Sequence, residues 1–205
     1  MDYKTLADDK VINQTIAALK GNGVEGLVVA NGAEALAKIK ELIPAGASVM
    51  NGSSRTLEQI GFVDLLKAGK HGWNNLHDGI LAEQDKAKQG LLRKQAVLSD
   101  YYLGSVHALI STGEFLIASN TGSQLPHVVF TSPNIIFVVG AQKIVPNMAE
   151  AMNRLEKYVV PLEDENMKQK YGVGTQISKV VIFKKENPII GRKVRMIIVK
   201  ESLGF

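Results

Sequence analysis

Residues 6–52 alternate between amphipathic helix patterns and short apolar strand patterns, and this alternation constrains the fold more than any other feature. LADDKVINQTIAALKGNG places apolar side chains on one helical face, with aspartates at its start and glycines at its end. GLVVANG then has the pattern of a buried strand, AEALAKIKELI that of a second helix, and ASVMNG that of another strand. Strands joined through helices pair in parallel, because a parallel crossover needs about a dozen residues or more. The sequence therefore predicts an α/β sheet covered by helices on both faces.

The rest of the chain is first helical and then rich in strands. Residues 56–100 are helical and polar in patches, with HGWNNLHDG as an irregular insert. From Val106 onward, strands are predicted at VHALIS, EFLIASN, IIFVVG, ISKVVIF and RKVRMIIVKE, and the run is interrupted by one amphipathic helix, NMAEAMNRLEKYV. No internal repeat or low-complexity linker divides the sequence, so we expect residues 1–205 to form a single domain.

Composition excludes several classes of function. No apolar run reaches the roughly 18 residues that span a bilayer, and MDYKTLADDK lacks the layout of a signal peptide, so we expect a soluble, cytoplasmic protein with no membrane span. The absence of cysteine excludes disulfides, thiolate-bound zinc or iron–sulfur clusters, and a cysteine nucleophile in this chain. The formal net charge of +4 suits anionic ligands, but it is not clustered as in nucleic-acid binders, and we expect no nucleic-acid partner.

The first polar segment, NGSSRTLEQIG, directly follows the predicted strand ASVMN. Open α/β sheets bind ligands where their strands end. Free backbone N–H groups at a helix start, together with the hydroxyls and guanidinium of Ser53, Ser54, Arg55 and Thr56, suit a phosphate or carboxylate. The alternative is that Ser54 or Thr56 merely caps the helix, but capping gives no reason for Arg55. We therefore take all four as candidate ligand-binding residues.

The second polar segment lies within SVHALISTGEFLIASNTGSQLP. STGE predicts a hairpin turn, which places Glu114 at the start of a strand and SNTGSQ at its end. Glu114 is a candidate catalytic carboxylate, and the alternative is that it is simply solvated. The polar run is expensive to bury without partners, so it either lines a wet cleft or grips the backbone of a neighbouring loop. Its candidate ligand-binding residues are Asn120, Thr121, Gly122, Ser123 and Gln124.

The third polar segment, KYGVGTQISKVVIF, precedes a predicted strand. Gly174 would let the backbone approach a ligand closely and Thr175 offers a hydroxyl, whereas Lys179 is a second candidate catalytic residue. An ordinary turn is the alternative for the glycines. In GAQKIV, Lys143 follows another predicted strand and is either a ligand-binding cation or a side chain facing solvent.

The sequence contains no pattern that specifies a metal or a cofactor. None of the four histidines has the spacing with other ligands that a zinc site requires, so we expect no metal site. A P-loop is absent, as is a GxGxxG after the first strand, so the cofactor remains unspecified.

Several segments together resemble the LUD domain family of lactate-utilization proteins. The resemblance spans residues 48–205 and rests on NGSSRTLEQIGF, SDYYLGSVHALISTGEFLIASNTGSQLP, GAQKIV, AMNRLEKYVVPLE, GVGTQISK and MIIVKESLGF. It implies a three-layer sandwich with a mostly parallel central sheet, like the fold of sugar-phosphate isomerases and CoA transferases. Related folds bind phosphorylated sugars, CoA thioesters or folates at their strand ends, and GSSRT matches a turn that often holds phosphate or carboxylate there.

The resemblance also implies a part in the oxidation of lactate to pyruvate by a complex with iron–sulfur partners, in which this cysteine-free chain would be the cluster-free subunit. Two hypotheses follow. The chain either binds a small anionic or phosphorylated metabolite, with isomerase-like or acyl-transferase-like chemistry, or it is a non-catalytic accessory subunit. Convergence of Arg55, Glu114, Asn120 and Lys179 on one concave site would favour the first hypothesis. The sequence leaves open whether the chain is an enzyme and whether it forms a homo-oligomer.

Overall fold

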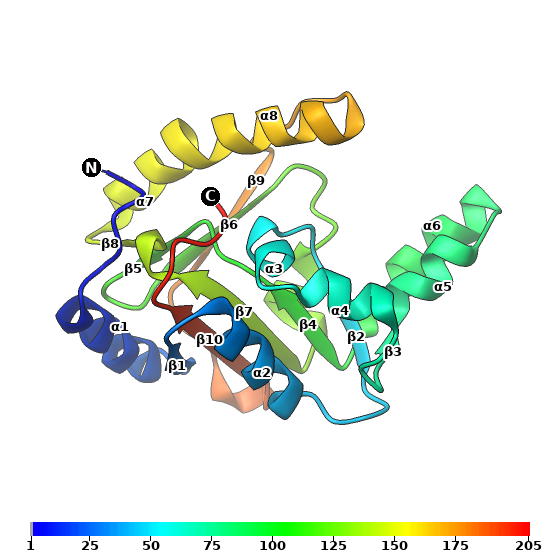
Figure 1. Ribbon diagram of the computed structural model, residues 1–205, viewed down its shortest axis with the longest axis horizontal. Helices are drawn as coiled ribbons and strands as arrows, with labels where there is room; N and C mark the ends of the chain where they lie inside the picture. Colours follow the sequence, from blue (N-terminus) through cyan, green and yellow to red (C-terminus); the bar gives the residue numbers. More distant parts are fainter. Residues whose placement is uncertain (1) are drawn as a thin grey trace.

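A parallel sheet of six strands forms the centre of the protein (Figure 1), as seen in a computed structural model that describes residues 2–205. The strands are, in spatial order, β1 (Glu25–Val29), β10 (Lys193–Val199), β7 (Asn134–Gly140), β4 (Tyr101–Gly104), β2 (Ser48–Asn51) and β3 (Asn74–Asn75). All neighbouring strands in this sheet are parallel. β7 and β10 are buried along most of their length, as their continuous apolar runs require. The predicted α/β fold with a mostly parallel central sheet is confirmed.

Helices cover one face of this sheet. They are α2 (Gly32–Leu42), α3 (Arg55–Gln59) and α4 (Phe62–Ala68). Ala35 and Ile39 of α2 lie one turn apart on the same helical face, and both are fully buried against Val138 and Ile197 of the sheet. The apolar stripe predicted for this helix is therefore its core-facing side.

The other face is covered by α1 (Asp9–Gly21) and by a second sheet of four strands. Its strands are, in order, β8 (Ile144–Val145), β5 (Ala108–Ile110), β6 (Phe115–Ser119) and β9 (Lys179–Phe183). β5 and β6 form the predicted antiparallel hairpin. Because side chains alternate along a strand, Phe115 and Ile117 pack toward the central sheet, whereas Leu116 and Ala118 pack away from it.

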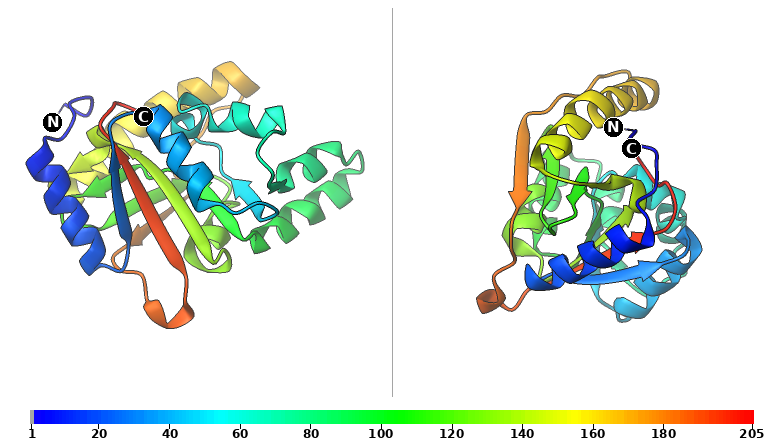
Figure 2. Two further views of the ribbon diagram at one scale, coloured as in Figure 1. Left: turned by 60° about the horizontal axis from the view of Figure 1, so that its bottom comes forward. Right: turned by 90° about the vertical axis from the view of Figure 1, so that its left-hand side faces the viewer.

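The outer side of the second sheet is covered by a long helical segment. α7 (Met148–Arg154) continues through a π-helical stretch, η4 (Leu155–Val159), into α8 (Val160–Tyr171). The π-helical stretch ends just before Pro161, which lacks an N–H and whose ring excludes a regular α-helical bond to the preceding turn. The segment extends well beyond the predicted NMAEAMNRLEKYV. In the right-hand view of Figure 2, α8 crosses the top of the molecule, and α1 and α2 lie at the bottom.

Two other segments differ from the sequence-based expectation. SDYYLG contains β4, which was not predicted although it is central in the sheet. HVVF, whose apolar side chains would suit a buried segment, is part of a π-helical turn, η2 (His127–Thr131), in which Val129 and Phe130 are exposed.

The remaining elements are α5 (Leu76–Ala82) and α6 (Lys86–Gln95), which project from the body (Figure 1), and three short 3₁₀ turns, η1 (Ala96–Leu98), η3 (Ala141–Lys143) and η5 (Pro188–Ile190). Within residues 2–205, no helix combines the length and the apolar character needed to cross a membrane.

Candidate ligand-binding site

A cavity of about 290 Å³ lies at the carboxyl ends of the central strands. Its wall includes Gly52–Thr56 after β2, Ser105–His107 after β4, Lys143 after β7 and Phe205 after β10. The end of β6, the loop before β9 and the segment η4–α8 complete the wall. This is the edge at which open α/β sheets bind their ligands, because the loops that follow the strands separate there.

The GSSRT segment forms one side of the cavity. A side chain at Gly52 would place its Cβ 2.4 Å from Tyr102 Oη, so only glycine fits between the loop and the buried tyrosine. Ser54 caps α3 by accepting a hydrogen bond from Leu57 N at 3.3 Å, and it also lines the cavity. Ser54 can therefore cap α3 and form part of the cavity wall at the same time.

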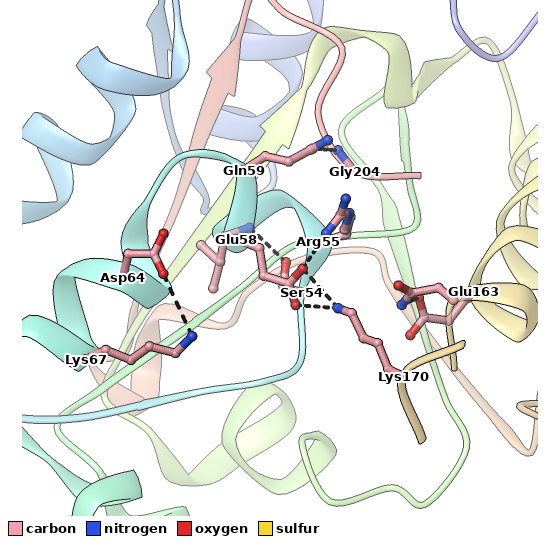
Figure 3. A network of polar contacts seen from close by, with 11 residues as sticks. Ser54, Arg55, Glu58, Gln59, Asp64, Lys67, Glu163, Lys170 and Gly204 are labelled. Carbon is pink, nitrogen blue, oxygen red and sulfur yellow. Dashed lines mark hydrogen bonds and ion pairs between the residues drawn. The ribbon is translucent and has the colours of Figure 1, made fainter. Parts of the chain in front are cut away.

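A salt bridge joins α3 to α8 beside the cavity (Figure 3). Glu58 accepts hydrogen bonds from Arg55 Nη1 at 2.8 Å and from Lys170 Nζ at 2.9 and 3.1 Å. Burial alone would raise the pKa of Glu58, but the hydrogen bonds from Lys170 and Arg55 outweigh it and hold that pKa below its usual value. The Arg55 side chain is 44% exposed and is already paired.

Lys143 carries a buried amine at the cavity wall. The residue is only 4% exposed, and its Nζ donates to Thr56 Oγ1 and Ser105 Oγ, both at 3.1 Å, and to Val106 O at 3.3 Å. None of the described acidic residues forms a salt bridge with it. Burial, assisted by the positive charge of Arg154, lowers the pKa of Lys143 to about 7.

Arg154 lies fully buried behind this wall. Its Nη1 donates to His107 O, and its guanidinium lies 5.9 and 5.4 Å from the ring centroids of Tyr3 and Tyr158. Within residues 2–205, Nε and Nη2 have no hydrogen-bond partner. Burial lowers the pKa of Arg154 to about 10, which still leaves the group charged at neutral pH. A second cation is therefore buried close to the cavity, and it is stabilised only by two aromatic rings and one carbonyl.

His107 presents a neutral imidazole at the same place. Its Nδ1 accepts a hydrogen bond from Ala118 N at 3.1 Å, so the ring proton must reside on Nε2. Burial, followed by the charges of Lys143 and Arg154, lowers the pKa of His107 to about 3. His107 thus remains uncharged at neutral pH and has one N–H left to donate.

A carboxyl group lines the cavity from α8. Glu163 lies beside Lys170 on the same helix (Figure 3) and accepts a hydrogen bond from Asn166 Nδ2 at 3.0 Å. Burial raises the pKa of Glu163, and the hydrogen bond from Asn166 opposes this only in part. The cavity wall therefore carries a carboxyl group whose pKa is raised and an amine whose pKa is lowered.

Comparison with known proteins identifies the family. A family model described as the LUD domain matches residues 12–178. The chain belongs to the LUD domain family. This range of the LUD domain contains every segment of the cavity wall except Phe205. The predicted family membership is confirmed.

A solved structure supports the fold of this LUD domain. The crystal structure of a DUF162 family protein from Deinococcus radiodurans aligns with a TM-score of 0.54 and 13% sequence identity, covering 95% of this chain and 98% of that chain. At this identity the likeness shows the fold alone. The search of curated proteins found no match to this chain.

Ten of the predicted site residues line the cavity of the LUD domain. They are Ser53, Ser54, Arg55, Thr56, Asn120, Thr121, Ser123, Gln124, Lys143 and Thr175. The structure thus brings together residues from four separate parts of the sequence. Their role in binding a ligand stays a prediction.

Four predicted residues lie outside the cavity wall: Glu114, Gly122, Gly174 and Lys179. Glu114 precedes β6 and accepts a hydrogen bond from Thr112, whereas the cavity is at the other end of that strand. Lys179 is exposed and donates to Asn120 O at 3.4 Å on the outer side of the loop. Neither residue predicted to be catalytic lines the cavity.

The local backbone explains why glycine is present at positions 122 and 174. Gly122 has a φ of +87° in the turn after β6, and a Cβ there would lie 3.0 Å from Lys179 Cδ. A Cβ at Gly174 would lie 2.4 Å from Asp164 Oδ1, so this glycine lets the loop approach α8 rather than a ligand in the cavity. Within residues 2–205, no group of three His, Asp or Glu side chains could hold a metal ion.

Sequence reasoning missed several buried or partly buried polar groups beside the cavity, namely Tyr102, Ser105, His107, Arg154, Glu163 and Asn166. One of them does have a sequence signal. Arg154 falls on the apolar face of its helix, one turn from Ala151 and next to Leu155, and all three are buried. A charged residue at such a position indicates either an ion pair or a functional cation.

Proposed function

We propose that this LUD domain binds a small anionic metabolite, a carboxylate or a phosphorylated compound, in the cavity and takes part in lactate utilization. One observation carries the proposal: Lys143 and Arg154 are buried beside the cavity, and no carboxylate of residues 2–205 forms a salt bridge with either. A buried charge without a partner is costly. An anion in the cavity would offset that cost.

A third buried cation of the same chain supports this reasoning by contrast. Arg192 donates from Nε and Nη2 to the carboxylate of Glu186 at 3.2 and 3.1 Å, and their side chains are 4% and 8% exposed. Where a buried cation is structural, the chain supplies its counter-charge. Beside the cavity no carboxylate of residues 2–205 forms a salt bridge with Lys143 or Arg154, and a bound anion would supply the counter-charge.

The size of the cavity limits the ligand. Pockets for small molecules measure about 300 to 1,000 Å³, and the cavity, at about 290 Å³, is at the lower end of this range. The volume favours a compact acid or a sugar phosphate over a CoA ester or a folate. Lactate and pyruvate, the compounds with which the family is associated, are compact acids.

The polar groups around the cavity also favour ligand binding over a purely accessory role. An accessory surface would spread its polar residues over a flat face, whereas ten of the predicted residues line one concave site. Of the four residues whose convergence was to decide the question, Arg55 and Asn120 line this site, and Glu114 and Lys179 do not. Oxidation of lactate releases electrons, and this chain has no cysteine to hold a cluster. We therefore propose that iron–sulfur proteins are its partners and accept those electrons.

Ligand binding can be tested with thermal unfolding and titration calorimetry against lactate, pyruvate and a panel of sugar phosphates. A ligand at a hundred times its Kd should raise the Tm by roughly 6 °C for a domain of this size. Lys143→Met should abolish the shift. The matched control is Lys193→Met, which removes an exposed lysine at the amino end of β10, far from the carboxyl edge. Equal binding by Lys143→Met, or no binding by any compound of the panel, would contradict the proposal.

A further inference from the structure

We propose that Lys143 is a reactive amine that forms a Schiff base with a 2-oxo acid held in the cavity. This inference rests on the proposed function, because the carboxylate of the acid is the anion that the site is proposed to bind. It goes further by naming the class of substrate and a covalent step. It assigns the chemistry to a residue other than Glu114 and Lys179.

The position of Lys143 suits a nucleophile. The side chain follows β7 through the turn η3, lines the cavity and is almost completely shielded from solvent. No salt bridge with a described carboxylate holds its amine in the ammonium form, and the buried charge of Arg154 disfavours that form. Lysines become nucleophilic when they are desolvated next to another cation.

The hydrogen bonds of Lys143 are compatible with both protonation states. As an ammonium, Nζ donates to Thr56 Oγ1, Ser105 Oγ and Val106 O. Hydroxyls can donate as well as accept, so one of the two can turn its proton toward the lone pair of the neutral amine. A carboxylate partner would accept only and would favour the charged form. This environment therefore lets the amine lose its proton without losing its hydrogen bonds.

The proposed step balances without an oxidant or a reductant. The lone pair of the neutral Nζ attacks the carbonyl carbon, a C–N bond forms, and the carbonyl oxygen takes the electron pair and a proton to give a carbinolamine. The nitrogen then loses a proton, the hydroxyl group takes one and leaves as water, and a C=N bond forms. Glu163, whose burial favours the protonated carboxyl, lines the same cavity and is the group that we assign to protonate the leaving hydroxyl.

The carboxylate of the substrate would be held by the other groups of the site. His107 has an Nε2–H to donate, and Arg55, which also lines the cavity, supplies a charge. These contacts would orient the carbonyl carbon toward Nζ, so the 2-oxo acid is preferred to a simple aldehyde or ketone.

Reductive trapping tests the inference directly. The protein is incubated with pyruvate, reduced with borohydride and analysed by intact mass and peptide mapping. We expect one covalent adduct of reduced pyruvate per chain, located on Lys143. Lys143→Met should lower the labelling at least ten-fold. Lys179→Met, which removes an exposed lysine next to the cavity but outside its wall, should leave the labelling unchanged.

The outcomes separate the two proposals. If pyruvate raises the Tm but no adduct is found on Lys143, the Schiff base is wrong and the proposed function stands. If pyruvate gives neither a shift nor an adduct, and no other anion of the panel binds, both are wrong. Labelling scattered over surface lysines also overturns the inference. Because mapping is performed on the unaltered chain, the result holds even if Lys143→Met fails to fold.

Discussion

Lys143→Met should increase the stability of the protein at about pH 6 and decrease it at about pH 10, so that the two stability curves cross. Burial lowers the pKa of Lys143 from 10.5 to about 7, which corresponds to a penalty of about 5 kcal/mol for the charged form. Methionine removes this penalty, but it also removes three hydrogen bonds worth about 1 kcal/mol each. The variant should therefore be about 2 kcal/mol more stable at about pH 6, where both the folded and the unfolded lysine are protonated.

The difference in stability between Lys143→Met and the wild type changes sign as the pH rises. Between pH 7 and 10 the unfolded chain keeps the proton that folded Lys143 has lost, and stability rises with pH wherever the unfolded state binds more protons. The wild type should gain about 3 to 4 kcal/mol over this range relative to the variant. It should then be the more stable protein by about 1 to 2 kcal/mol at about pH 10.

Urea unfolding at a series of pH values measures this difference. Trp73 is the single tryptophan and is 9% exposed, so its fluorescence reports on the folded core. Lys193→Met, at an exposed position, should follow the wild type at every pH. A difference between wild type and Lys143→Met that stays constant from about pH 6 to about pH 10 would refute the reasoning, because the buried amine would then keep its proton throughout.

Three further predictions concern the cavity. Arg55→Ala should lower the affinity for a confirmed anionic ligand by less than about ten-fold in calorimetry, because the guanidinium is 44% exposed and already paired with Glu58. An unchanged affinity would remove Arg55 from the site. Gly122→Val should lower the free energy of ligand binding by more than the free energy of unfolding. The φ of +87° and the 3.0 Å distance from the added Cβ to Lys179 Cδ would force the loop to move, and normal binding would contradict this. Glu163→Gln should bind pyruvate but slow its borohydride-trapped labelling by about a hundred-fold, and an unchanged rate would exclude Glu163 as the proton donor.

Local pattern was enough to predict most of the central sheet but not all of its strands. The helix–strand alternation indicated parallel pairing because the crossovers leave no other simple arrangement. β4 escaped prediction because its four residues, YYLG, have neither an alternating nor a long apolar pattern. Its place is determined by pairing with β2 and β7, whose partner residues are distant in sequence.

The sequence alone could have shown that Glu114 does not share a site with SNTGSQ. The predicted hairpin already placed Glu114 at the start of a strand and SNTGSQ at its end. The strand that separates them, β6, has five residues and at about 3.3 Å per residue spans roughly 17 Å, so both groups could not act on one small ligand. The convergence of SNTGSQ with GSSRT depends instead on how the second sheet packs against the first.

The burial of Lys143 depends on a contact that no local pattern encodes. The segment after β10 returns over the carboxyl edge, and Gly204 lies so close that a Cβ there would be 3.0 Å from Lys143 Nζ and 2.3 Å from Thr56 Oγ1. This segment helps to cover the lysine, whereas the sequence had left a solvent-facing position open. The reactivity proposed for Lys143 would therefore be a property of the tertiary structure.

The meaning of the missing counter-charge of Lys143 can be tested by comparing Lys143→Met with Arg192→Met. Arg192→Met also replaces a buried cation with methionine, but it leaves the Glu186 carboxylate buried without its partner. Breaking such a pair costs about 3 to 5 kcal/mol, or roughly 7 to 12 °C in Tm for a chain of this length. At about pH 6, urea unfolding should show Arg192→Met strongly destabilised and Lys143→Met stabilised. If both variants lose stability alike, Lys143 is a structural cation like Arg192, and its missing counter-charge is no argument for a ligand.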